Sequence, residues 1–175
     1  SELLVAPVSD TGEAPVWAGE LPPVPIEVAL EVGRLRRSAA TAVGAMESQK
    51  GDLEFDEYPL SDVARDDLLR AVTEHLDATE NLPTDKVLTV ETRQKTVVLN
   101  TCRGSKINET LAHFIQAMGS MREGKMGTTL VDPYRIAFQV PGTKAVHVVE
   151  WISNTSPEAL ETILRMTIPN GRALR

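Results

Sequence analysis

The chain has 175 residues, which is the size of one globular domain with room for a hydrophobic core. Its net charge of −7 argues against a generally basic nucleic-acid-binding protein, but seven acidic residues cluster within 52–67 and leave the remainder nearly neutral. A single cysteine excludes an internal disulfide and favours a cytoplasmic location, and no apolar run is long enough to span a membrane. The first five residues lack the basic region of a signal peptide, and the three histidines lack zinc-finger spacing.

The N-terminal residues predict a short strand followed by an irregular arm. Leu3–Val5 is a candidate strand, and it starts so early that we expect the chain to begin inside a larger protein. Four prolines in residues 15–25 then impose an extended path. Trp17 lies on this path and has two interpretations. It packs at the edge of the domain, which is the more frequent fate of a tryptophan, or it presents its ring to a base of single-stranded nucleic acid.

Two helices are predicted next. Apolar residues at helical spacing, with a proline in the first turn, predict a helix from Pro25 to Ala45. This helix carries the densest cationic patch in the chain, which consists of Arg34, Arg36 and Arg37. The patch is either a solvated face or a contact to backbone phosphates. After an acidic connector at 48–60, Ser61 predicts the N-cap of a second helix that ends at Leu82-Pro83.

The central stretch, Val97–Met118, predicts a buried strand that leads directly into an amphipathic helix. The strand belongs to Lys95–Cys102, the expected hairpin partner of Val87–Glu91. The turn before the helix has Arg103, Gly104 and Lys106, with Ser105 and Asn108 as possible N-caps. Backbone N–H groups, the helix dipole and two cations at one spot suit an anion, although most such turns are plain connections. The P-loop spacing is absent, so nucleotide hydrolysis is not predicted.

The C-terminal third predicts two more strands and two short elements. Thr128–Val131 and Tyr134–Val140 are strands joined by an Asp132-Pro133 turn. Ala145–Ile152 fits a helix capped by Thr143, but its apolar spacing also fits a strand. Ser156-Pro157 begins the last helix, which ends at Pro169. These elements together predict an α+β fold, in which an antiparallel sheet of four or five strands packs with about five helices.

No catalytic constellation emerges from the residue types. Cys102 with His113 or His147 would form a nucleophile and base, but a cysteine at the end of an apolar strand is usually a buried, inert thiol. Asp66 and Asp67 are adjacent, so they diverge on a helix and cannot share a substrate. The residues alone therefore indicate a module without catalytic machinery and with a possible anion-binding turn.

Three separated stretches together resemble one family. They are Ala14–Pro22 running into a helix with Glu31–Arg37, then Cys102–Leu111, and finally Val131–Ile136. Their order and spacing are similar to those of the accessory region downstream of the motor domains in large helicase-related (Lhr-type) ATP-dependent helicases of the DEAD/DEAH superfamily. The resemblance implies one accessory domain over residues 1–175, divided into an arm and long helix (1–47), an acidic connector (48–60) and an α+β core (61–175).

The resemblance also implies a function. In such helicases two RecA-like domains hydrolyse ATP with Mg²⁺, and a winged-helix domain and the accessory domain close a channel around one nucleic-acid strand. The accessory domain itself needs no cofactor, and its expected partners are single-stranded or partly duplex nucleic acid and the other domains of the parent chain, with no membrane. The parent would be a hydrolase active in DNA repair. The implied contacts to the strand are stacking by Trp17, phosphate contacts by Arg103, Lys106, Asn108 and Arg135, and a secondary patch of Arg34, Arg36 and Arg37.

Two hypotheses from other classes compete with this one. The acidic connector and the proline-rich arm could dock a protein partner, which would make the chain a non-catalytic interaction module. Alternatively, Cys102 could be the nucleophile of a hydrolase. A native-state reaction with a thiol reagent tests the latter.

Overall fold

The computed structural model describes residues 22–48, 58–79, 81–124, 127–139 and 142–167. These residues form five helices and four antiparallel strands, which is the predicted α+β arrangement. The predicted strand at residues 3–5 and most of the acidic connector lie outside the described residues. In chain order the elements are α1 (Ile26–Ser48), α2 (Asp62–Ala78), β1 (Thr89–Arg93), β2 (Thr96–Asn100), α3 (Ser105–Glu123), β3 (Thr128–Val131), β4 (Arg135–Gln139), α4 (Ala145–Asn154) and α5 (Pro157–Thr167).

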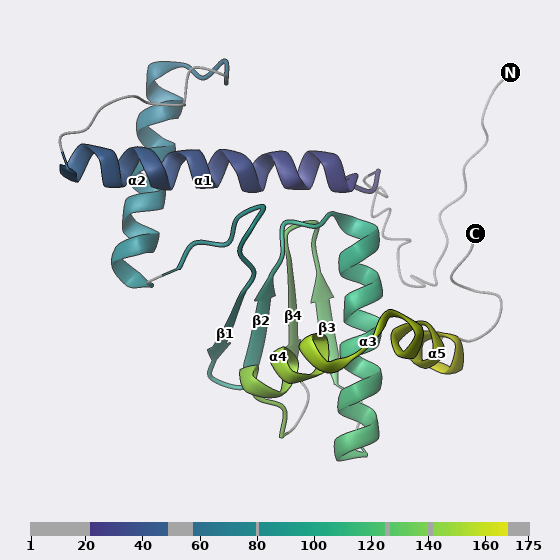
Figure 1. Cartoon of the computed structure of the whole chain (residues 1–175). Helices are drawn as coiled ribbons and strands as arrows, with labels where there is room; N and C mark the ends of the chain where they lie inside the picture. Colours follow the sequence, from purple (N-terminus) through teal and green to yellow (C-terminus); the bar gives the residue numbers. More distant parts are fainter. Residues whose placement is uncertain (1–21, 49–57, 80, 125–126, 140–141, 168–175) are drawn as a thin grey trace, which may run out of the picture.

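The sheet and the three C-terminal helices share one hydrophobic core. The strand order is β1-β2-β4-β3, so the central strands are β2 and β4, where Leu99 is the partner of Ile136. Alternate residues of both strands are buried, because successive side chains of a strand point to opposite faces. Their buried side chains pack against α3 and α4, which cover one face of the sheet in Figure 1. Phe114 of α3 and Trp151 of α4 are large members of this core.

A second, smaller core lies between α1 and α2. Ala39, Ala42 and Val43 of α1 pack with Val72 of α2, and partly buried leucines surround them. Small residues on α1 allow the two helices to approach closely. Figure 1 shows α1 lying across one end of the sheet while α2 crosses α1. The helix α2, which the predicted division assigns to the α+β core, thus packs mainly on α1.

Local capping signals were reliable where a polar side chain could reach the backbone. The Ser61 hydroxyl accepts a hydrogen bond from the Ala64 amide at 3.3 Å, which confirms the predicted start of α2. Segment 145–154 is a helix and not a strand. Its N-cap is Lys144 and not the predicted Thr143, because the ring of His147 accepts from the Lys144 amide at 3.2 Å and closes the first turn.

Candidate nucleic-acid interface

The turn that connects β2 to α3 is held from two sides by internal carbonyl groups. The Gly104 amide donates to the Pro133 carbonyl at 2.8 Å, and the Ser105 amide donates to the Val24 carbonyl at 3.0 Å. Gly104 has a φ of 84°, and a Cβ there would lie 2.7 Å from the Val24 carbonyl oxygen, so only glycine fits. These amides are therefore occupied by the protein itself. Of the two interpretations that the sequence left open, these amides fit the plain structural connection and not the anion-binding turn.

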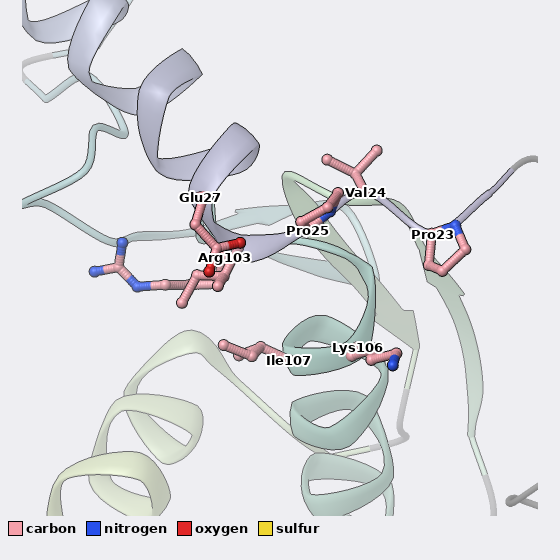
Figure 2. A pocket seen from close by; sticks show the side chains of 8 residues that line it. Pro23, Val24, Pro25, Glu27, Arg103, Lys106 and Ile107 are labelled. Carbon is pink, nitrogen blue, oxygen red and sulfur yellow. The ribbon is translucent and has the colours of Figure 1, made fainter.

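The same turn is hydrogen-bonded to the segment that precedes α1. The Val24 amide donates to the Ser105 hydroxyl at 2.9 Å, so Ser105 holds a distant segment instead of capping its own helix, whose N-cap is Gly104. This contact lays Pro23–Pro25 beside the start of α3 and leaves a pocket of about 440 Å³ between them. Figure 2 shows Arg103 and Lys106 at this pocket, with their charged ends pointing away from each other. The two predicted cations thus share one pocket but do not converge on one point.

Asn108 lies in the interior, so its prediction as a phosphate contact is wrong. The side chain is fully buried. The Thr101 hydroxyl donates to its Oδ1 at 2.6 Å, and its Nδ2 donates to the Asp132 carbonyl at 2.7 Å. This buried amide has both ends hydrogen-bonded, so it ties α3 to the end of β2 and to the β3–β4 turn and cannot reach a nucleic acid on the surface.

Three of the predicted phosphate-binding arginines, Arg36, Arg37 and Arg103, instead contact residues in distant segments of the chain. Arg37 donates to both carboxylate oxygens of Asp85, at 2.8 and 3.1 Å. Arg103 donates to the Asp85 carbonyl at 3.1 Å. Arg36 donates to the Cys102 sulfur at 3.2 Å and lies over the ring of Tyr134, with its guanidinium carbon 5.7 Å from the ring centroid. We refer to these six residues as the arginine clasp.

The electrostatics of the clasp follow from these contacts. The hydrogen bond from Arg37 lowers the pKa of the Asp85 carboxyl, against the opposing effect of its burial. Burial raises the pKa of the Cys102 thiol, with the nearby Arg36 acting in the opposite direction. Cys102 is completely buried, and its contact is an arginine and not a histidine. The arrangement supports the inert-thiol interpretation and offers no general base for a nucleophile.

The remaining predicted cations lie on the surface. Arg34 pairs with Glu31 at 3.2 Å, and Arg135 pairs with Asp132 at 2.7 Å; their side chains are 53% and 65% exposed. Lys106 is also exposed. Asp132 additionally accepts from the amides of Tyr134 and Arg135, which confirms the predicted Asp132-Pro133 turn. Trp17 lies outside the described residues.

The sequence interpretation missed two partners of these arginines. Asp85 follows Pro83 in an irregular segment, and nothing local indicates that its carboxylate meets a helix 48 residues earlier. Tyr134 is the partner of Arg36. It stands next to Arg135 in the third stretch that resembles the family, and an aromatic residue next to a cation in the sequence was the available signal. Within the described part of the chain, no group of three or more His, Cys, Asp or Glu residues could hold a metal ion. None of the described helices is long and apolar enough to cross a membrane.

The fold and the arginine clasp define a class of protein. In this class an α+β module is joined to a helical hairpin, here α1 and α2, by arginine side chains. The family model described as "DEAD/H associated" matches residues 82–175, more than half of the chain, so this chain belongs to the DEAD/H-associated family. A solved structure of the Mycobacterium smegmatis helicase Lhr bound to ssDNA and AMP-PNP is similar in fold, with a TM-score of 0.63 and 19% identity. The match covers 91% of this chain and 20% of that helicase chain. No curated protein sequence matches the chain.

These findings confirm the resemblance that the three stretches carried. The family model begins at Leu82, a few residues after the end of α2, and so covers the sheet and α3–α5. The structural match reaches further, because 91% of the chain includes much of the α1–α2 hairpin as well. The chain spans about one fifth of the length of the helicase that it resembles.

Proposed function

We propose that this chain is a nucleic-acid-contacting accessory domain of an ATP-dependent helicase, in which it grips the tracked strand. The observation that supports this most is the match in fold, over 91% of the chain, to a helicase whose structure holds single-stranded DNA. Membership of the DEAD/H-associated family points to the same accessory role. Because the chain corresponds to only 20% of that helicase, ATP and Mg²⁺ would be bound by motor domains elsewhere in the parent protein, alongside a winged-helix domain.

The described residues proposed to meet the strand are those whose charge is available at the surface. Arg135, Arg34 and Lys106 are exposed, and Arg103 is half-buried beside Lys106. Phosphate contacts from such side chains position a strand without reading its sequence. Trp17 would add stacking on a base, which typically contributes roughly 1–3 kcal/mol per base.

The test is a salt titration of strand binding. A labelled single-stranded oligonucleotide is titrated with the 175-residue chain at several salt concentrations, and the slope of log K against log [salt] counts the phosphates neutralised. We expect measurable, salt-dependent binding that Trp17→Ala weakens by about fivefold or more and that Trp17→Phe largely retains. Absence of binding at low salt would refute the proposed function and favour the protein-interaction module. Undiminished binding by Trp17→Ala would remove only the stacking role.

A second observation is independent of any binding assay. If the proposal is correct, the reading frame that encodes this chain also encodes ATPase motifs upstream of Ser1. A parent protein without a motor region would contradict a helicase accessory role even if the chain bound nucleic acid.

A further inference from the structure

A second cleft, of about 410 Å³, lies between α2 and the end of the sheet where β2 ends and β4 begins. It shares no residue with the pocket beside Lys106. One wall is apolar and comes from α2 and the segment after it, with Leu68, Ala71, Val72, Leu82 and Pro83. The other residues are polar or aromatic: Arg36, His75, Asn100, Asp132, Tyr134 and Arg135.

The polar side of the cleft favours an anion. Its lining residues include two arginines, Arg36 and Arg135, and one carboxylate residue, Asp132. Arg36 is held in place by the Cys102 sulfur at 3.2 Å and by the Tyr134 ring, so little side-chain entropy remains to be lost on binding. Arg135 is oriented by Asp132 at 2.7 Å but remains 65% exposed, so a phosphate can still approach it.

The other side favours a flat apolar group. Tyr134 lines the cleft together with the leucines and the proline of the apolar wall, and Arg36 lies over one face of its ring. Nucleobases stack on aromatic rings regardless of their identity, because every base has a π-face. A single nucleotide carries both required parts, a phosphate and a base, whereas free phosphate would leave the apolar wall uncovered.

We propose that this cleft is a nucleotide-binding subsite, in which one nucleotide of a single strand places its phosphate between Arg36 and Arg135 and its base against Tyr134. The inference rests on the proposed function, since it assumes that a single strand is the ligand. It adds a contact surface built from α1, α2 and the ends of β2 and β4. A strand bound here touches Leu68, Val72 and Leu82 of the smaller core between α1 and α2.

The experiment compares variants of the 175-residue chain in binding to a labelled oligothymidylate of about 15 nucleotides. Tyr134→Leu removes the π-face but retains apolar bulk, and the Tyr134 carbonyl still accepts from the Thr101 and Cys102 amides. We expect this variant to bind at least about fivefold more weakly and Tyr134→Phe to bind like the original chain. Thermal melting of each variant checks that the fold persists.

Arg135→Ala tests the phosphate contact and has a matched control. Like Arg135, Arg165 of α5 is exposed and is paired with a nearby carboxylate. Its partner is Glu161 of the same helix, at 2.6 Å. Both substitutions remove one positive charge, but only Arg135 lines the cleft. We expect Arg135→Ala to weaken binding and to lower the salt slope by about 0.7, and Arg165→Ala to leave the slope unchanged.

The outcomes separate this inference from the function on which it rests. If Tyr134→Leu binds like the original chain, or if Arg135→Ala behaves like Arg165→Ala, the subsite is refuted, while the proposed accessory function stands as long as the original chain binds the oligonucleotide. Unchanged oligonucleotide binding by these variants is also the result expected if the cleft accommodates an apolar peptide instead of a nucleotide. If the original chain binds no oligonucleotide at low salt, the proposed function fails and the subsite fails with it.

Discussion

Replacing Arg37 by alanine tests whether the arginine clasp holds the helical hairpin to the sheet. The substitution removes two hydrogen bonds to Asp85, at 2.8 and 3.1 Å, and leaves that carboxylate, whose side chain is only 9% exposed, without its main partner. Losing one partner of a fully buried ion pair typically costs about 3–5 kcal/mol. Because the Arg37 side chain is 42% exposed, we expect a smaller loss of about 2 kcal/mol in the free energy of unfolding.

Urea denaturation followed by circular dichroism measures this loss, and Arg34→Ala is the control. Arg34 is on the same helix and also pairs with a carboxylate, but both partners are about half exposed. An exposed pair of this kind contributes about 0–1 kcal/mol. The reasoning would be refuted if Arg37→Ala were no more destabilising than Arg34→Ala. A double-mutant cycle with Asp85→Ala then measures the coupling between the two clasp residues directly.

The pH dependence of the same variant provides a second readout. The pKa of Asp85 is lowered from its ordinary value of 3.8 chiefly by the Arg37 hydrogen bond, so below about pH 4 the unfolded chain binds more protons than the folded chain. The contribution of Asp85 to stability is therefore complete above that pH and is lost as pH falls through the folded-state pKa. We expect the difference between the original chain and Arg37→Ala to shrink on acidification below pH 4. A difference that grew with acidification would contradict this sign.

Two further predictions address the packing beside the clasp. A Cβ on Gly33 would lie 2.5 Å from the Asp85 amide nitrogen, whereas one on Gly44 of the same helix would meet nothing within 4 Å. Thermal melting should therefore show Gly33→Ala destabilised by about 1–3 kcal/mol and Gly44→Ala stabilised by about 0.5–1 kcal/mol, and equal effects would contradict the close approach. The Cys102 thiol, buried and with a raised pKa, should react with a thiol reagent only when the protein is unfolded. Rapid reaction of the native protein would revive the hydrolase hypothesis.

The sequence predicted the fold well where local signals were strong. The Thr128–Val131 strand, the Ser61 cap and the Asp132 turn each depend on residues within a few positions, and all three occur in the structure. Segment 145–152 was ambiguous because its valines fit both periods. Tertiary packing decides it, since Val148 and Trp151, three positions apart, are both buried against the sheet core, as one face of a helix requires.

The candidate site was less predictable, because the charge of a side chain does not indicate which residue it contacts in the fold. The sequence shows where Arg34, Arg36 and Arg37 are, but not that the first faces solvent while the other two meet Tyr134 and Asp85. The same holds for Asn108, a plausible cap by position, whose amide is consumed by contacts 7 and 24 residues away. Contacts between distant segments depend on the fold, and a single sequence does not encode them locally.

Arg36 connects the stability of the chain with its proposed function, because it belongs to both the clasp and the cleft. The walls of the cleft come from α2 on one side and from the ends of β2 and β4 on the other, so the clasp that positions the hairpin also sets the width of the cleft. A ligand that binds only the folded arrangement with the clasp formed stabilises that arrangement, and the stabilisation grows with its affinity. A single strand held between Arg36 and Arg135 would therefore raise the stability of the clasp, and a weakened clasp would lower the affinity for the strand by the same linkage.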